Sequence, residues 1–174
     1  MSRRPLSFDL VCATVGRTEE LKRFLASLER QTYRAFRVLL VDQNDDDRLA
    51  PLLASCSSLE LVHLRSQSGL SRARNAALPS IVADVVAFPD DDCAYPSDLL
   101  ERVAQRLAAQ PDLAGLTGRA VDPSGSFAPS WAKERGVLRQ DTLWNRAISF
   151  AIFLRREVVE RLGRFDEALG LGAG

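Results

Sequence analysis

The feature that most constrains the fold of this chain is the regular alternation of short apolar runs with stretches of helical periodicity. We expect strands at residues 8–15, 36–41, 59–64 and 84–88, and helices that begin near Thr18, Arg48, Leu70 and Ser97. In the first helical stretch, Leu21, Phe24, Leu25 and Leu28 follow the spacing of a single helix face. The alternation predicts an α/β fold with three layers, in which helices cover both faces of a mostly parallel central sheet.

After Pro111 this alternation becomes less regular. We expect further strands at residues 113–121 and 148–154, and a helix that begins near Arg155. The segment 126–146 has no clear periodicity, and the glycine-rich end of the chain predicts no regular element. The late strand would present Ile148, Phe150, Ile152 and Leu154 on one partly uncovered face, which favours self-association as a homodimer.

Charge and length exclude several classes of protein. The 174 residues suit a single domain, and the 23 Lys+Arg balance the 23 Asp+Glu, which argues against a nucleic-acid binder. No apolar run reaches the ~18 residues of a membrane span. The cysteines Cys12, Cys56 and Cys93 lie far apart, which predicts free thiols and a cytoplasmic location. His63 is the only histidine, which argues against a Ser-His-Asp triad. The alternation of residues 59–64 marks it as an ordinary strand residue.

Carboxylates gather where the predicted strands end. Ligands of open parallel sheets bind at the carboxyl ends of the strands, where this chain has Asp42 after the second strand and Asp90, Asp91 and Asp92 after the fourth. Adjacent carboxylates raise one another's pKa, and a divalent cation removes that penalty. Mg²⁺ or Mn²⁺ typically takes one or two carboxylates together with phosphate oxygens. A solvated acidic loop is the alternative interpretation.

A second cluster, residues 68–75, opens the third helix. Gly69 allows a tight turn into a helix whose N-terminus can face an anion. Arg72 and Arg74 add guanidinium donors that suit phosphate, although one of them could instead pair with the aspartates. A diphosphate held between a metal and an arginine accounts for both clusters.

Several segments occur together in a characteristic order. They are Val11–Arg17 with the helix after it, Val38–Asp42, Gly69–Asn75, Phe88–Asp92 with Pro96, and Phe153–Glu157 with Gly163–Glu167. In this order they resemble the motifs of the inverting family-2 glycosyltransferases, whose fold is the Rossmann-like GT-A fold. The resemblance implies transfer of a sugar from a nucleotide-diphosphate donor, with a UDP-sugar as one candidate, and a Mn²⁺ or Mg²⁺ cofactor.

The resemblance also implies a set of residues that bind the nucleotide-sugar. They are Thr14, Arg17, Asp42, Arg72, Arg74 and Asp90. Thr14 and Asp42 would hold the nucleobase, Arg74 would serve the pyrophosphate, and Asp90 would meet the ribose. Asp91 would hold the metal.

The remaining aspartate of the run, Asp92, would hold the metal or its bound waters by the same resemblance. A cation at this position neutralises the charge of a diphosphate leaving group.

The resemblance divides the chain into residues 1–121, a nucleotide-sugar-binding half, and residues 122–174, the start of an acceptor-side half. The family's general base follows its Phe-Asp-Glu stretch, so we expect the base beyond Gly174 and assign it to neither Asp166 nor Glu167. The acceptor would be a saccharide or a lipid-linked molecule. Residues 133–164 hold eight Lys/Arg and four Asp/Glu, which could suit peripheral contact with an anionic membrane, although solvated helix faces explain it as well.

Two other functions remain open from sequence alone. One is a non-catalytic nucleotide-sugar-binding protein that lacks the acceptor-side base. The other is a Mg²⁺-dependent phosphotransferase of the haloacid-dehalogenase type, which the Asp90–Asp92 run superficially fits. That class places its aspartates after the first strand, where this chain has Thr14 to Arg17.

Overall fold

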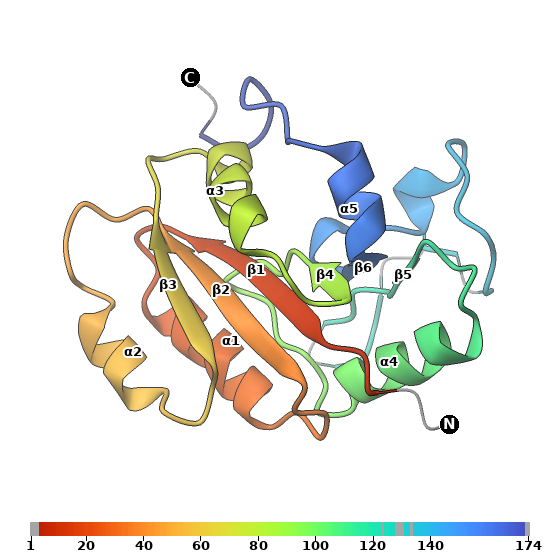
Figure 1. The fold of residues 1–174 in the computed structure, drawn as a ribbon, viewed down its shortest axis with the longest axis horizontal. Coiled ribbons are helices and arrows are strands. Elements are labelled where there is room, and N and C mark those ends of the chain that lie inside the picture. Colours follow the sequence, from red (N-terminus) through yellow and green to blue (C-terminus); the bar gives the residue numbers. More distant parts are fainter. Residues whose placement is uncertain (1–3, 123, 128–130, 133, 173–174) are drawn as a thin grey trace.

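In the computed structural model, which describes residues 4–122, 124–127, 131–132 and 134–172, a six-stranded sheet forms the centre of the molecule (Figure 1). Its strands are β1 (Phe8–Thr14), β2 (Phe36–Asp42), β3 (Leu61–Arg65), β4 (Val85–Ala87), β5 (Gly115–Thr117) and β6 (Ile152–Arg155), in the order β3-β2-β1-β4-β6-β5. The helices are α1 (Glu19–Glu29), α2 (Ala50–Ser55), α3 (Leu70–Ala77), α4 (Leu99–Ala109) and α5 (Arg156–Leu162). None of these helices is long and apolar enough to cross a membrane.

Strand pairing sets which ends of the sheet lie together. The pairs β1–β2, β2–β3 and β1–β4 are parallel, whereas β6 runs antiparallel to both β4 and β5. As a result β5 has the same direction as β4, and the carboxyl ends of β1 to β5 share one edge of the sheet. This confirms the mostly parallel sheet predicted from the sequence.

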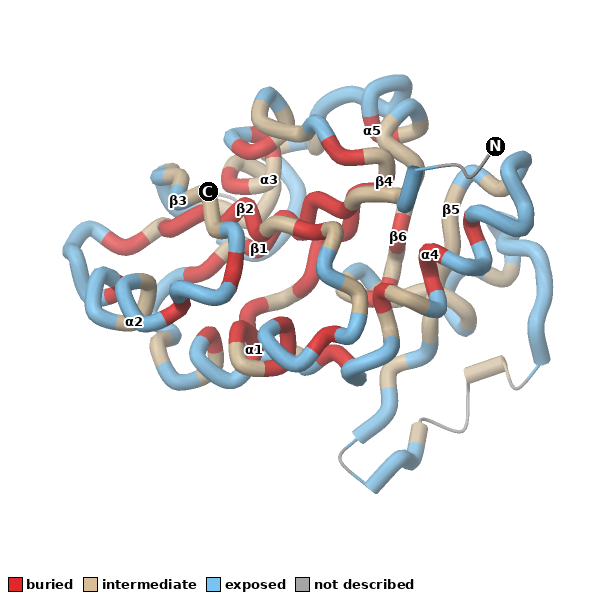
Figure 2. Tube along the Cα trace, turned by 60° about the horizontal axis from the view of Figure 1, so that its bottom comes forward, coloured by how far each residue is buried: buried red, intermediate tan, exposed pale blue. Residues whose placement is uncertain are grey.

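Helices cover both faces of the sheet, with α1, α2 and α4 on one side and α3 and α5 on the other (Figure 1). The alternation of side chains along β1 explains the two layers, because Leu10 packs into the core with Leu21 of α1, whereas Val11 packs with Ala73 of α3. Figure 2 shows buried residues running along the central strands and the inward sides of the helices. The three-layer architecture is therefore confirmed.

The late strand is the main error of the sequence-based prediction. Residues 149–151 form a 3₁₀ turn, and β6 begins only at Ile152. The carbonyl of Phe150 accepts a hydrogen bond from the Tyr95 hydroxyl at 2.7 Å, and the carbonyl of Ala151 accepts one from Gly118 N at 2.9 Å. Because β4 is only three residues long, it offers no partner for an earlier start of β6. The expected strand face that included Ile148 and Phe150 does not form.

One smaller prediction also changed, and one was confirmed. The strand expected at residues 113–121 is limited to Gly115–Thr117. The three cysteines are free thiols, as expected, and Cys12 and Cys56 are buried.

Candidate functional site

Three strand ends bring the predicted residues to one edge of the sheet. Thr14, the last residue of β1, is in register with Asp42, the last residue of β2. On the other side of β1, Ala13 forms an isolated parallel bridge with Asp90. The topology thus places the acidic run of residues 90–92 beside the end of β1, as the sequence predicted.

Arg17 links the second and third carboxylates of this run. Its Nη1 lies 3.1 Å from Asp91 Oδ1 and 2.6 Å from Asp92 Oδ2. Asp91 also accepts a hydrogen bond of 2.7 Å from Thr14 Oγ1, and its side chain is only 9% exposed. The side chain of Asp92 is 50% exposed. The two residues expected at the metal therefore differ, because Asp91 faces inward and Asp92 faces solvent.

Asp90 is paired with Arg74, whose Nη2 lies 3.8 Å from Asp90 Oδ1. Burial of Asp90 raises the pKa of its carboxyl, and the charge of Arg74 opposes this effect. The guanidinium of Arg74 lies against a pair of phenyl rings that contact each other, 5.6 Å from the centroid of Phe88 and 5.4 Å from that of Phe165. These rings leave the side chain 13% exposed and fix the position of its charge.

Asp42 reaches the same edge, but its carboxylate is enclosed and 0% exposed. Its Oδ1 accepts hydrogen bonds from N and Nδ2 of Asn44 at 2.9 and 2.7 Å, and its Oδ2 lies 3.0 Å from His63 Nε2. Burial raises the pKa of Asp42, but the hydrogen bonds from Asn44 and His63 and the charge of Arg65 together hold it below its ordinary value. Asn44 Oδ1 in turn accepts a hydrogen bond from Gly16 N at 2.7 Å. This network positions the loops that follow β1 and β2.

Sequence reasoning gave His63 no role at the site. It lies on β3, where Asp42 pairs in register with Arg65, two residues further on. Side chains two positions apart on a strand point to the same face, so His63 and Arg65 both reach Asp42. Only the register of β3 on β2 reveals this contact.

Gln43 is a second residue that sequence reasoning missed. Its backbone N donates to the Thr14 carbonyl at 3.0 Å, which holds it beside the end of β1. Its side-chain Oε1 is buried and has no hydrogen-bond partner among the described residues. Buried polar atoms nearly always have a hydrogen-bond partner, so an acceptor of this kind without one is unusual.

The start of α3 differs from the open anion site that the sequence predicted. Leu70 N donates to the Leu171 carbonyl at 3.0 Å, and Ser71 Oγ donates to the Leu169 carbonyl at 2.7 Å. Gly69 has φ +126°, and a Cβ there would lie 3.5 Å from the Gly172 carbonyl oxygen. The segment 169–172 therefore covers this end of α3.

Arg72, expected to bind the donor, points toward its own loop and toward the segment after α5. Its Nη1 donates to the Ser68 carbonyl at 3.0 Å, and its Nε lies 3.5 Å from Glu167 Oε2. Arg74 alone of the two α3 arginines contacts the acidic run, as the alternative interpretation of residues 68–75 proposed.

Asn75 fixes the segment that follows α5. Its Nδ2 donates to Glu167 Oε1 at 2.9 Å. This bond, with further ones from Arg164 and Arg72, lowers the pKa of Glu167. Glu167 thus belongs to a network that joins α3 to the segment after α5.

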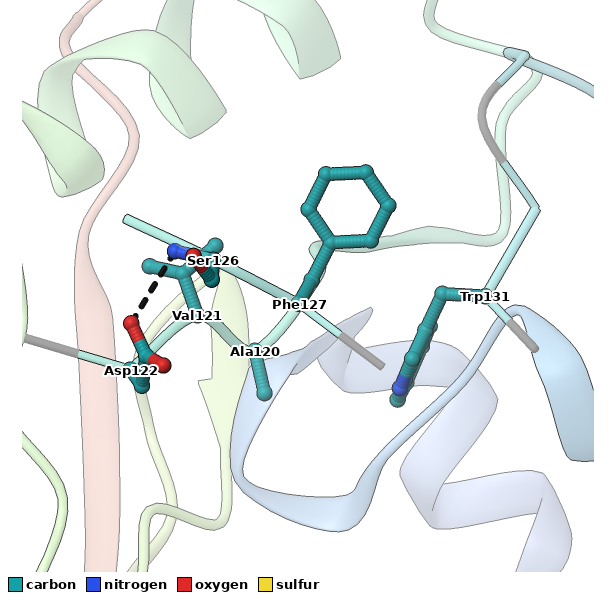
Figure 3. A pocket seen from close by; sticks show the side chains of 6 residues that line it. All are labelled: Ala120, Val121, Asp122, Ser126, Phe127 and Trp131. Carbon is teal, nitrogen blue, oxygen red and sulfur yellow. Dashed lines mark hydrogen bonds between the residues drawn. The ribbon is translucent and has the colours of Figure 1, made fainter. Parts of the chain in front are cut away.

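A pocket of about 530 Å³ lies beyond the carboxyl end of β5. Figure 3 shows the residues that line it, Ala120, Val121, Asp122, Ser126, Phe127 and Trp131. The guanidinium of Arg119 lies 4.2 Å from the centroid of the Phe127 ring. Because β5 has the direction of β4 and is separated from it by β6 alone, the pocket lies on the same edge of the sheet as the acidic run.

The sheet order and the two helical layers define the GT-A glycosyltransferase fold, as a comparison with solved structures shows. The crystal structure of S. aureus TarS 1-349 in complex with UDP-GlcNAc matches with a TM-score of 0.80 at 20% identity, over 97% of this chain and 51% of that chain. The mannosyltransferase PcManGT from Pyrobaculum calidifontis, in complex with GDP-Man and Mn²⁺, matches with a TM-score of 0.72 at 20% identity, over 99% of this chain and 50% of that one.

The sequence model of Glycosyl transferase family 2 matches residues 9–163, and the chain belongs to this family. Curated relatives include the glycosyltransferase AglE of Haloferax volcanii, which is 24% identical over 92% of this chain. The succinoglycan biosynthesis protein ExoM of Rhizobium meliloti is 28% identical over 100% of it. The aligned chain spans 56% of the length of AglE and 60% of ExoM.

Proposed function

We propose that this chain is the donor-binding part of an inverting glycosyltransferase that uses a nucleotide-diphosphate sugar and a divalent cation. The observation that carries the proposal is the pairing of the carboxylates after β4 with Arg17 and Arg74, which come from two other segments. Together they place anionic and cationic groups side by side at the edge where open α/β sheets bind ligands. Family membership supports glycosyl transfer as the reaction.

The carboxylates fit a hard divalent cation. Asp92 offers solvent-facing oxygen ligands, and the side chain of Asp90 is also partly exposed. Among the described residues, no three His, Cys, Asp or Glu side chains gather into a complete metal site. Mg²⁺ and Mn²⁺ commonly take only one or two carboxylates and complete their shell with phosphate oxygens and water. We propose that Asp92 contacts the cation directly and that Asp91, held by Thr14, supports it.

When bound, the cation would neutralise charge on the diphosphate leaving group. The residues of the chain have separate tasks. Arg74, packed against Phe88 and Phe165, holds a positive charge beside Asp90. Charge-assisted bonds from such a guanidinium to phosphate oxygens are stronger than neutral ones and define the orientation of the donor.

The structure favours Gln43 as the residue that contacts the nucleobase. Its Oε1 is a buried acceptor without a partner among the described residues, and a turn of the side chain toward the ligand would let a base N–H supply the missing donor. Asp42, which the sequence analysis placed at the nucleobase, uses both carboxylate oxygens within the protein and would position the loop that carries Gln43. TarS and PcManGT were solved with UDP-GlcNAc and GDP-Man, which supports a nucleoside diphosphate as the ligand class.

We further propose that the acceptor approaches from the pocket after β5. Phe127 and Trp131 offer apolar ring surface suited to a saccharide (Figure 3). Asp122 also lines the pocket, although its Oδ1 already accepts hydrogen bonds from Ser124 and Ser126. The pocket lies on the sheet edge that carries Asp90 and Asp92, so donor and acceptor could meet there. Under this proposal, residues 122 onward begin the acceptor side.

Calorimetric titration of UDP and of GDP, each with MnCl₂ and with EDTA, tests the donor proposal. We expect one of the two to bind with Mn²⁺ and to lose most of its affinity with EDTA. Asp92→Asn should reproduce the effect of EDTA, whereas Asp112→Asn, an exposed carboxylate after α4, should bind as the wild type does. Equal affinity with and without the metal would refute its role.

A further inference from the structure

Arg17 differs from Arg74 in how firmly the protein holds it. The side chain of Arg17 is 50% exposed, and its contacts among the described residues go to the carboxylates of Asp91 and Asp92. Gly16, just before it, has φ +69°, and a Cβ at this position would meet no atom within 4 Å. Arg74 is instead packed against two rings, and its side chain is 13% exposed. One arginine is therefore fixed and the other can leave its partners.

The bonds around Asp91 make such a departure feasible. Asp91 is largely buried, and a buried carboxylate without a partner would be strongly unfavourable. It keeps the hydrogen bond of 2.7 Å from Thr14 Oγ1 when Arg17 moves. Asp92 is half exposed and can be solvated or bound to a cation. The movement of Arg17 thus leaves no buried charge without a partner.

We propose that Arg17 is a displaceable internal counter-cation that occupies Asp91 and Asp92 in the free protein and transfers to the diphosphate when the donor binds. The inference rests on the proposed function and adds to it a mechanism that couples the binding of the cation to the binding of the diphosphate. A divalent cation and Arg17 compete for the same carboxylates, so the cation alone binds weakly. A diphosphate removes the competitor by attracting the guanidinium, and each ligand then tightens the binding of the other.

The charges at the site give the direction of the effect. The three carboxylates of Asp90–Asp92 are paired with the two guanidinium groups of Arg17 and Arg74. The net charge that attracts a cation to the free protein is therefore a single negative charge. Neutralising Arg17 would raise this to two negative charges. The affinity for a cation alone should therefore increase, even though the affinity for the diphosphate decreases.

The test measures Mn²⁺ binding directly, by the electron paramagnetic resonance signal of free Mn²⁺, with and without UDP or GDP. For Arg17→Gln we expect Mn²⁺ alone to bind roughly three- to fivefold more tightly than to the wild type, the upper range for an exposed ion pair. The factor by which the nucleotide tightens Mn²⁺ binding should fall by a similar amount. Arg17→Lys keeps the charge but loses the planar guanidinium, so its affinity for Mn²⁺ should lie between those of the wild type and Arg17→Gln.

Arg23→Gln is the matched control, because Arg23 is an exposed arginine of α1 that pairs with Glu20. It should bind Mn²⁺ as the wild type does. If Arg17→Gln binds Mn²⁺ alone no more tightly than the wild type, while both bind Mn²⁺ with the nucleotide, the counter-cation role is refuted and the proposed function stands. If neither protein binds Mn²⁺ under any of these conditions, the proposed function is refuted and the inference with it.

Discussion

Asn75 and Phe165 exchange two hydrogen bonds across ninety positions of the sequence. Asn75 Nδ2 donates to the Phe165 carbonyl at 2.9 Å, and Phe165 N donates to Asn75 Oδ1 at 2.8 Å. The pair ties α3 to the segment after α5 and presents the Phe165 ring to Arg74. Two of the family-like segments thus form one structural unit.

The hydrogen bonds between Asn75 and Phe165 lead to a prediction for the free energy of unfolding. Asn75→Ala leaves the N–H and C=O of Phe165 without partners, so we expect the free energy of unfolding to fall by about 2–3 kcal/mol. Urea denaturation measures it. Gln105→Ala, which removes an exposed amide on α4, should change the free energy by less than about 0.5 kcal/mol. A similarly small change in Asn75→Ala would show that the segment after α5 is not held by this residue.

The lowered pKa of Asp84 leads to a prediction of how the free energy of unfolding depends on pH. Burial raises the pKa of Asp84, but hydrogen bonds from Ser7 and Arg4 outweigh it and hold the pKa below its ordinary value. The stabilisation is therefore complete above the pKa of the unfolded chain, about pH 4, and is lost as the pH falls below it. We expect the acid-induced decrease in unfolding free energy to be smaller in Asp84→Asn. Parallel pH profiles of the two proteins would contradict this role.

Gln43→Ala should separate recognition of the nucleobase from recognition of the phosphates. Without the amide, we expect UDP or GDP to bind about fivefold or more weakly in the presence of Mn²⁺, the loss of roughly one hydrogen bond. Binding of inorganic pyrophosphate, which has no base, should not change. Calorimetry with the three ligands decides between the outcomes, and an equal loss for pyrophosphate would place Gln43 outside the base site.

Trp131 and Trp144 offer a matched pair for the acceptor side. Trp131 lines the pocket after β5, whereas Trp144 is 89% exposed. On an array of immobilised saccharides, we expect Trp131→Ala to lose any binding that the wild type shows, and Trp144→Ala to keep it. Donor binding should be the same in all three proteins. If only Trp144→Ala lost saccharide binding, the acceptor site would lie at the surface around Trp144 and not in the pocket after β5.

Local patterns were sufficient to predict the framework of the fold. The central strands are buried on both faces and therefore have continuous apolar runs, and the helices show one apolar face, as at Leu21 and Leu28. Because parallel strands end at a common edge, the sequence also placed Asp42 and Asp90 near each other.

The details of the site depend on contacts that no local pattern encodes. The register of β3 decides that His63 meets Asp42, and the fold of residues 169–172 decides that the start of α3 is covered. From the sequence we expect a cation to offset the acidic run and place Arg17 among the donor-binding residues. In the structure Arg17 itself provides a counter-charge to this run.

The bond between Thr14 and Asp91 also bears on how the protein folds. It joins residues 77 positions apart, and β1 pairs with β4 over a similar separation, so the edge of the sheet that carries the acidic run exists only after this long-range pairing. Pairings of this kind fold slowly compared with local contacts. A fragment of the chain that ends before β4 lacks the acidic run altogether. Capture of a nucleoside diphosphate during refolding would therefore report the docking of β4 on β1.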